Sequence, residues 1–323
     1  MPDIITFGEM LIDFVPTVSG VSLMDAPAFI KAPGGATANV AVGVSRLGVS
    51  AGFMGKVGDD AFGHFLERTL HEANVDTKAL RFASDARTTL AFVSLRADGE
   101  REFVFYRHLD KDMLLKYAPA EVDTDYIRSG KIFHYGSISL ITEPSRTASQ
   151  LAVGAARSAG LTISYDPNLR LNLWPDEDAA REGLMTGWRQ AHIVKASEDE
   201  MTFLTGRTDL AAAVDQLWHF DLKLLVVTLG KHGCRYFTPK FTGEVASFDV
   251  TSVDTTGAGD GFVAGLLTGL HQHTNALTNE AILREICRRA NAVGALTTMQ
   301  RGAIPALPTT VQLNSFLDQH AHA

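Results

Sequence analysis

The sequence predicts an α/β fold in which a mostly parallel sheet is covered by helices. Short apolar runs of the strand type alternate along the chain with segments whose apolar residues recur at helical spacing, and repeated βα units of this kind build parallel sheets. Glycine-rich or acidic turns follow several of these runs, where α/β sheets gather their ligands. With 323 residues, 46% of them hydrophobic and 20% charged, the chain has ample material for a core. Because no repeat, low-complexity segment or linker divides it, we expect a single domain over residues 1–323.

Composition argues against several classes of protein. The formal net charge is −8, whereas nucleic-acid-binding proteins are typically basic. The charge therefore favours an enzyme that acts on small molecules over a nucleic-acid-binding protein. Cys234 and Cys287 lie far apart in the sequence without any Cys/His cluster, which argues against a zinc site and against a disulfide scaffold. We expect both thiols to be reduced. The first residues lack a basic signal region, and no window approaches the ~18 apolar residues of a membrane span, which predicts a cytoplasmic protein.

The first strand is expected at 4–7, and acidic residues follow it closely. Glu9 and Asp13 therefore stand near the end of a strand where ligands bind in open α/β sheets. Asp13 is flanked by apolar residues, so it is either a turn acid or a ligand-binding group. The turn is the commoner role for such an acid.

A glycine-rich turn at 32–39 leads into a helix that ends near Gly48. Asn39 falls in the first turn of this helix, where an amide either caps the backbone or reaches a ligand. Capping is the commoner role. Next in order are a strand at 51–57, a turn at 58–60 and a helix at 62–73.

A β-hairpin then interrupts the alternation. Strands at 88–95 and 101–106 flank an Asp-Gly turn. A small sheet formed by parts of 12–33 and 88–107 is a candidate lid over the main sheet. Arg107 ends the hairpin; an exposed arginine is usually only solvated, but one carried by a lid would be well placed to contact a substrate.

The second half of the chain resumes the βα alternation. Strands are expected at 132–135, 161–165, 193–194, 224–228, 234–238 and 243–250, with the last apolar run continuing to 253. Helices are expected at 198–204, 210–220, 259–271, 279–299 and 310–320.

The stretch 254–263 carries the strongest chemical signal. Gly257, Ala258 and Gly259 place small residues where an extended run meets a helix, so backbone N–H groups can approach a phosphate that the helix dipole favours. Asp260, beside them, can accept a proton from an attacking hydroxyl. A plain βα turn explains this segment alone about equally well, because short glycine-rich matches are common.

Other turns at strand ends supply polar groups suited to phosphate or sugar oxygens. Thr228, Gly230 and Gly233 form a second small-residue turn, and the two turns together can embrace a polyphosphate. Neither the dinucleotide fingerprint nor a Walker A loop is present. Four further candidates, for which an ordinary turn or a helix cap is an equal or safer explanation, are Asn168, Arg170, Lys195 and Glu198.

Two motifs resemble the signatures of the ribokinase-like, or phosphofructokinase-B, sugar kinases: Gly34-Gly35-Ala-Thr-Ala-Asn39 and Asp254-Thr-Thr-Gly-Ala-Gly-Asp260. Between them lie stretches similar to those of the bacterial fructokinases of this family, among them Phe105-Tyr-Arg107 and Tyr165-Asp-Pro-Asn-Leu-Arg170, so the resemblance covers nearly the whole chain. It implies ATP-dependent phosphorylation of a sugar hydroxyl. It also implies a Rossmann-like three-layer αβα sandwich with a small β-sheet lid.

The resemblance further implies roles for individual residues. Asp260 is expected to be the general base, and the N–H groups of Gly257, Ala258 and Gly259 to form the anion hole. Expected sugar contacts are Asp13, Gly34, Gly35, Asn39, Arg107 and Arg170. Expected ATP contacts are Asn168, Lys195, Glu198, Thr228, Gly230, Gly233, Gly257, Gly259 and Asn291. Many members have Asn where this chain has Lys195, but fructokinase-like members also carry Lys, so a phosphate contact is expected there.

ATP and Mg²⁺ are the implied cofactors, with Glu198 acting on Mg²⁺ through water. The monovalent-cation loop of the family matches at Asp254, Thr256 and Gly302, whereas Ala306 lacks the hydroxyl of some members, which puts K⁺ activation in question. A homodimer is expected, because family members often pair through their lids.

Fructose is the expected acceptor, giving fructose 6-phosphate and ADP. Within the family, 2-keto-3-deoxygluconate and an aminoimidazole riboside are the alternatives. A sugar sensor without turnover is opposed by the retention of Asp260 and the complete turn before it. An NAD-dependent oxidoreductase is disfavoured by the missing dinucleotide fingerprint.

Overall fold

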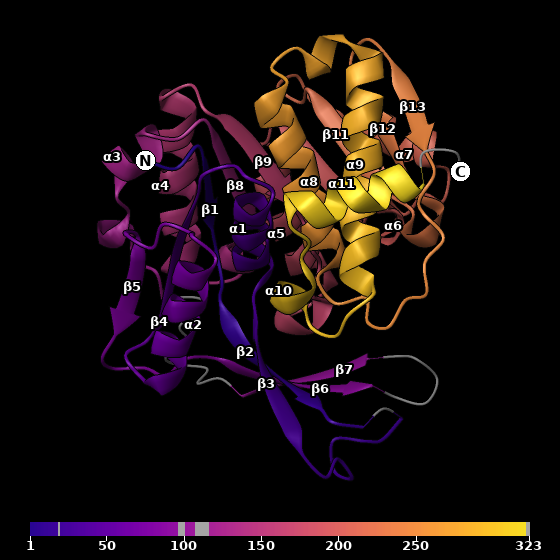
Figure 1. The fold of residues 1–323 in the computed structure, drawn as a ribbon. Helices are drawn as coiled ribbons and strands as arrows, with labels where there is room; N and C mark the ends of the chain where they lie inside the picture. Colours follow the sequence, from indigo (N-terminus) through magenta and orange to yellow (C-terminus); the bar gives the residue numbers. More distant parts are fainter. Residues whose placement is uncertain (19, 96–100, 107–115, 321–323) are drawn as a thin grey trace.

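The computed structural model describes residues 1–18, 20–95, 101–106 and 116–320, and its centre is a large twisted sheet (Figure 1). The strand order is β13-β12-β11-β10-β9-β8-β1-β4-β5, and neighbours are parallel from β11 to β5 while β12 and β13 are antiparallel. Its strands are β1 (Ile4–Phe7), β4 (Ala51–Gly58), β5 (Leu80–Ala83), β8 (Ile132–Gly136), β9 (Thr162–Asp166), β10 (Ile193–Ser197), β11 (Leu224–Thr228), β12 (Cys234–Phe237) and β13 (Thr242–Val245).

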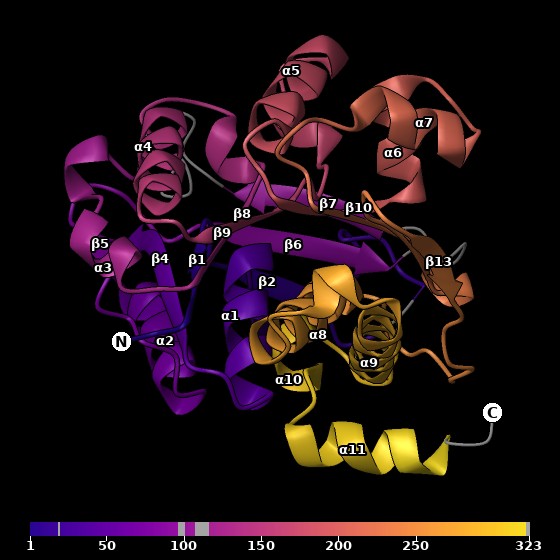
Figure 2. The same ribbon diagram turned by 90° about the horizontal axis from the view of Figure 1, so that it is seen from above.

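Helices cover both faces of this sheet, so the predicted three-layer α/β sandwich is confirmed (Figure 2). One face carries α1 (Ala36–Arg46), α2 (Ala61–Glu72), α8 (Ala258–Gln272), α9 (Glu280–Thr298), α10 (Ala303–Ala306) and α11 (Thr310–Gln319). The other carries α4 (Ser145–Ser158), α5 (Glu177–Trp188), α6 (Glu198–Thr205) and α7 (Leu210–Leu217); a short helix, α3 (Thr124–Arg128), precedes β8.

A small second sheet stands off the main sandwich (Figure 1). Its order is β3-β2-β6-β7, from β2 (Leu11–Pro16), β3 (Phe29–Gly34), β6 (Leu90–Leu95) and β7 (Arg101–Tyr106). β6 and β7 pair antiparallel, as the hairpin prediction requires, while the expected Asp98-Gly99 turn and Arg107 lie outside the described residues. Phe14 stacks on Phe92 within the sheet, at a centroid separation of 4.9 Å.

The second sheet is fastened to the main sandwich at Asp60, the N-cap residue of α2. The Asp60 carboxylate accepts the backbone N–H groups of Phe62 and Gly63 at 3.0 and 2.9 Å, and also the N–H and Oγ1–H of Thr88 at 2.9 and 2.8 Å. Thr88 lies just before β6 and also accepts the N–H of Gly58 through its Oγ1 at 3.1 Å. One carboxylate thus joins a helix start to the root of the second sheet.

The strand predicted over 243–253 is largely wrong. β13 ends at Val245, and the residues after it form no strand. Phe248 and Val250 give this segment its alternating apolar pattern, but they pack against the helical core instead of a strand neighbour. The ring of Phe248 lies edge-on to that of Phe316 in α11, 5.1 Å between centroids.

The helices α4 and α5 have no counterpart among the predicted elements, whereas the expected helices at 62–73, 259–271, 279–299 and 310–320 agree with the structure to within one residue or so at each end. The helix expected at 210–220 ends earlier, at Leu217. Within the described ranges, no helix is both long enough and apolar enough to cross a membrane.

Helices α1 and α8 pack in direct contact, because glycine stands where they meet. A Cβ atom added to Gly43 of α1 would lie 2.6 Å from the Cβ of Ala264 in α8, well inside contact distance. The absence of a side chain at Gly43 therefore sets how closely the two helices approach.

We predict that Gly43→Ala destabilises the protein by about 1–3 kcal/mol, because the added methyl group overpacks the α1–α8 contact. Gly154→Ala in α4 is the matched control, since a Cβ there meets nothing within 4 Å; it should stabilise by about 0.5–1 kcal/mol through helix propensity. Urea unfolding of both variants measures the difference, and equal effects of the two substitutions would contradict this account of the contact.

Candidate active site

The start of α8 is shaped by Gly257, which adopts a left-handed conformation with φ +78°. A Cβ at this position would lie 2.6 Å from the Cβ of Ala303, so the close approach also requires glycine. Of the three N–H groups expected to bind an anion, that of Ala258 makes a long bond of 3.3 Å to the carbonyl of Thr255. The turn thus presents its small residues at the N-terminus of a long helix, where an anion is favoured.

The start of α1 is built around a second glycine pair. Gly35 has φ +117°, and a Cβ there would lie 2.3 Å from the carbonyl oxygen of Glu9. A Cβ on Gly34 would lie 2.2 Å from Oδ2 of Asp13, so the Asp13 carboxylate sits directly over Gly34. Asp13 belongs to β2 and is not a turn acid. These contacts press the turn before α1 against the segment that leaves β1.

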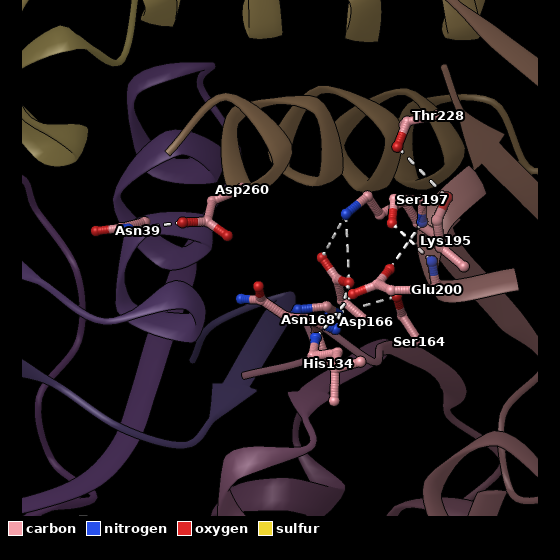
Figure 3. A network of polar contacts seen from close by, with 12 residues as sticks. Asn39, His134, Ser164, Asp166, Asn168, Lys195, Ser197, Glu200, Thr228 and Asp260 are labelled. Atoms are coloured by element: carbon pink, nitrogen blue, oxygen red, sulfur yellow. Dashed lines mark hydrogen bonds and ion pairs between the residues drawn. The ribbon is translucent and has the colours of Figure 1, made fainter. Parts of the chain in front are cut away.

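Asn39 and Asp260 join the two helix starts. Nδ2 of Asn39 donates to Oδ2 of Asp260 at 2.7 Å, although the residues are 221 positions apart in the sequence. Asn39 therefore does not serve as the backbone cap that is commoner for such a residue. Figure 3 shows this pair facing a space whose opposite side carries Lys195, Asp166 and Asn168.

A pocket of about 200 Å³ occupies this region. Ten of the predicted site residues line it: Asp13, Gly35, Asn39, Asn168, Arg170, Lys195, Thr256, Gly257, Gly259 and Asp260. Its lining also includes residues that sequence reasoning did not assign to the site: Glu9, Leu11, Ala36, Phe105, Ile138 and Thr255. Glu9 could have been found from its place at the end of the first strand, and Phe105 of β7 from its place in the Phe105-Tyr-Arg107 stretch, beside the expected sugar contact Arg107.

Lys195 supplies a buried positive charge to the pocket. Its Nζ lies 3.1 and 3.3 Å from the two carboxylate oxygens of Asp166, and both side chains are at least nine-tenths buried. Burial opposes the charge, but the carboxylates of Asp166 and Glu200 outweigh it and raise the pKa of Lys195. A Cβ on Gly259 would lie 3.2 Å from Nζ, which places the ammonium group beside the turn at the start of α8.

The turn after β9 is held by the capping box of α6. Glu200 accepts the N–H of Leu169 through Oε1 and that of Ser197 through Oε2, both at 2.7 Å. Asn168, in the same turn, has φ +41° and donates its N–H to Asp166 at 3.1 Å. These bonds fix the side of the pocket that carries Asn168 (Figure 3), and Arg170 follows in the same turn and also lines the pocket.

Asp260 is electrostatically suited to take up a proton near neutral pH. Its burial raises the pKa of the carboxyl to about 6, against the hydrogen bond from Asn39 that lowers it. The nearby Asp166 carboxylate raises the pKa further, whereas the cations of Lys195 and Arg170 lower it. A carboxylate with a raised pKa at the end of a small pocket is the expected form of a general base.

Asn168, Lys195, Gly257 and Gly259, four of the residues expected to contact ATP, line this pocket, and the other expected ATP contacts lie outside its lining. Thr228 ends β11 and is in register with Ser197 at the end of β10, so the turn containing Gly230 and Gly233 follows directly along the same sheet edge. Glu198 is exposed in the first turn of α6. Asn291 is buried, and its Nδ2 donates to the carbonyls of Val245 and Ala246, each at 3.1 Å.

The three residues expected around a monovalent cation are brought together. Oδ1 of Asp254 accepts the N–H and Oγ1–H of Thr256 at 2.9 and 2.7 Å, and Oδ2 accepts the N–H of Gly302 at 2.9 Å.

Gly34 and Ala258 adjoin the pocket without lining it, and Arg107 lies outside the described residues. Within the described part of the chain, no group of three His, Cys, Asp or Glu side chains is placed to hold a metal ion.

The sandwich with its small second sheet is the fold of a class of carbohydrate kinases. Residues 1–310 match the pfkB family carbohydrate kinase, and the chain belongs to this family. A relative called probable fructokinase-4, from Arabidopsis thaliana, is 56% identical over 316 residues, covering 97% of this chain and 96% of that protein.

Two solved structures have the same fold. The fructokinase of Xylella fastidiosa, solved with bound ATP, superposes with a TM-score of 0.90 at 33% identity, covering all of both chains. A double mutant of the Vibrio cholerae O395 fructokinase, bound to fructose, ADP and potassium ion, superposes with a TM-score of 0.88 at 34% identity, covering 98% of each chain.

We predict that Lys195→Met destabilises the fold by about 3–5 kcal/mol, because it leaves the Asp166 carboxylate buried without its counter-charge. Lys131→Met is the matched control: its ion pair with Asp3 at 2.9 Å is on the surface, with the lysine side chain 65% exposed, and its loss should cost about 0–1 kcal/mol. Chemical denaturation reports both values. A Lys195→Met protein as stable as the control variant would show that the buried pair does not hold this wall of the pocket.

Proposed function

We propose that the protein is an ATP-dependent fructokinase that converts fructose and ATP to fructose 6-phosphate and ADP, with Asp260 as the general base. The observation that carries the proposal is the Asp260 carboxyl, whose pKa burial raises to about 6, at the glycine turn that begins α8. The identity to fructokinases over nearly the whole chain supports fructose as the acceptor. A sugar sensor and an NAD-dependent oxidoreductase have no comparable support.

In this reaction the Asp260 carboxylate takes the proton of the sugar hydroxyl while the hydroxyl oxygen attacks the γ-phosphorus of ATP. The bond between that phosphorus and the bridging oxygen breaks, and ADP leaves with the bonding electrons. Lys195, beside Gly259, neutralises charge on the transferred phosphoryl group. Gly257 and Gly259 offer N–H groups to the same oxygens, and Ala258 would do so after giving up its long bond to Thr255.

Asp13, Gly34, Gly35, Asn39 and Arg170 are the proposed sugar contacts, and Arg107 stays a prediction from the sequence. Oδ1 of Asn39 is buried and has no hydrogen-bond partner among the described residues. Because a buried acceptor without a partner is costly, a sugar hydroxyl that donates to it would gain a strong contact.

The proposed nucleotide contacts are Asn168, Lys195, Glu198, Thr228, Gly230, Gly233 and Asn291. The common sheet edge at the ends of β10 and β11 supports this assignment. Asn291 would act by holding the backbone at 245–246, to which its amide nitrogen is bonded.

Mg²⁺ is the proposed divalent cofactor, and the exposed carboxylate of Glu198 would hold it through water. This arrangement fits Mg²⁺, which keeps several waters and takes substrate phosphates as ligands instead of a protein cage. When bound, the ion neutralises phosphate charge. The hydrogen-bonded cluster of Asp254, Thr256 and Gly302 supports K⁺ as a further activator, although Ala306 lacks a hydroxyl there.

The second sheet is proposed to act as a lid that excludes water from the pocket, as part of a single kinase domain. Phe105 of β7, in the lining of the pocket, supports this role. A homodimer formed through this sheet is supported by the apolar side chains exposed on it, Ile30, Val104 and Tyr106. Light scattering tests the dimer. A cytoplasmic location stays a prediction from the sequence.

We predict that Asp260→Asn lowers kcat by about 10²–10⁴-fold, the usual contribution of a positioned base, while the affinity for fructose stays within a few fold. In the wild-type protein kcat/KM should fall as the pH drops through about 6, because the carboxylate must be ionised to accept the proton. Turnover near that of the wild type in Asp260→Asn, with fructose bound normally, would remove Asp260 from the role of base.

A panel of acceptors in a coupled ADP-release assay tests the substrate. Fructose should give the highest kcat/KM, ahead of 2-keto-3-deoxygluconate and of an aminoimidazole riboside. The assay needs only the wild-type protein. A much higher kcat/KM with either alternative would overturn the assignment of fructose as the acceptor and would leave the assignment as a sugar kinase intact.

A further inference from the structure

The Glu9 carboxyl lies in the pocket wall and is unused by the phosphoryl-transfer chemistry described above. Glu9 follows β1, is only 3% exposed, and lines the pocket together with Asp13, Asn39 and Asp260. Its Oε1 accepts the N–H of Ala36, the first residue of α1, at 2.9 Å. Because the N-cap residue of α1 is a glycine with no side chain, Glu9 caps this helix from the neighbouring segment.

Capping alone does not account for an acid in this place. Burial raises the pKa of Glu9 to about 7, so keeping the ionised form in the pocket wall is costly, and a neutral hydroxyl or amide caps a helix as well. The charged groups that act on it across the pocket are Asp260, which raises the pKa further, and Arg170, which lowers it. Glu9 thus shares the pocket lining with both of these charged groups.

We propose that Glu9 is a substrate-binding and specificity-determining residue, whose carboxyl, held in place by the N–H of Ala36, forms a hydrogen bond with a hydroxyl group of the acceptor sugar. The inference rests on the proposed function and names the acceptor class more closely. Glu9, Asp13 and Asp260 bring three carboxyl groups to a pocket that also contains the cations of Lys195 and Arg170, and carboxyl groups so placed can accept hydrogen bonds from the hydroxyl groups of a polyhydroxylated sugar.

A site that binds a hydroxyl group discriminates strongly against an analogue that lacks it, because the buried polar group is then left without a partner. One monodeoxy derivative of fructose should therefore bind the wild-type protein much more weakly than fructose does. The same derivative should lose little further affinity once the Glu9 carboxyl is replaced, since the missing hydroxyl and the missing carboxyl would belong to one contact.

The decisive variant is Glu9→Gln, which keeps a carbonyl oxygen for the N–H of Ala36 and removes the acid. We expect an unchanged melting temperature, an unchanged KM for ATP, and a KM for fructose raised about tenfold or more, the usual effect of losing a hydrogen bond to a carboxylate. Asp176→Asn is the matched control: Asp176 caps α5 by accepting the N–H of Ala179 at 2.8 Å and lies outside the pocket lining. Asp176→Asn should leave the KM for ATP and the KM for fructose unchanged.

The measurements are KM and kcat for fructose and for its monodeoxy derivatives, in the wild type, in Glu9→Gln and in the control. A Glu9→Gln enzyme with the wild-type KM for every sugar would show that Glu9 only caps α1. If every deoxy sugar shows the same rise in KM relative to fructose in the wild type and in Glu9→Gln, the proposal is overturned as well. If Glu9→Gln does not fold, Glu9→Asp replaces it, and a Glu9→Asp enzyme with unaltered sugar preference overturns the proposal. A wild-type protein that phosphorylates no sugar would instead refute the proposed function itself.

Discussion

The direct packing of α1 on α8 is the contact on which the pocket depends. Where Gly43 meets Ala264 the helices approach without an intervening side chain, and Asn39 then lies 2.7 Å from Asp260. Neither helix carries a site alone: α1 brings an amide and a glycine turn, and α8 brings a carboxylate and a helix N-terminus. The pocket is thus complete only when the first βα unit and the C-terminal helices have assembled.

The charged groups of the pocket differ in the partners that the fold gives them. Lys195 is paired with the Asp166 carboxylate, so it keeps its positive charge in spite of burial. Asp260 has the neutral amide of Asn39 as its hydrogen-bond donor, and burial raises its pKa to about 6. One wall therefore holds a permanent positive charge, and the opposite wall holds a carboxyl group that can exchange a proton. Phosphoryl transfer to a hydroxyl requires both, because phosphate charge must be neutralised and the hydroxyl must lose its proton.

The sequence predicts best what is local. The βα alternation predicts a mostly parallel sheet covered by helices, which agrees with the structure, and the resemblance to sugar kinases implies the three layers. The glycine turns and Asp260 are visible as candidates because their chemistry follows from neighbours along the chain. The strand expected beyond Val245 failed because apolar periodicity does not distinguish a strand from a loop whose side chains pack on helices, as Phe248 does on α11. Glu9 and Phe105 have a signal in the sequence only through their places, at the end of the first strand and beside Arg107. That both residues line one pocket depends on how the two sheets pack, which no short pattern records.

The anchoring of the second sheet at Asp60 has a mechanical consequence. The Asp60–Thr88 bonds hold the root of β6 to the start of α2, and Phe14 of β2 lies edge-on to Phe62 of the same helix, 6.0 Å between ring centroids, so two strands of the second sheet are anchored at one helix. Phe105 pairs with Ala91, close to this anchor, whereas the pair Leu95 and Arg101 lies at the other end of the hairpin. The residue of β7 that lines the pocket therefore belongs to the anchored part of the sheet, so any displacement of the far end of the hairpin would be larger than the displacement of the pocket wall.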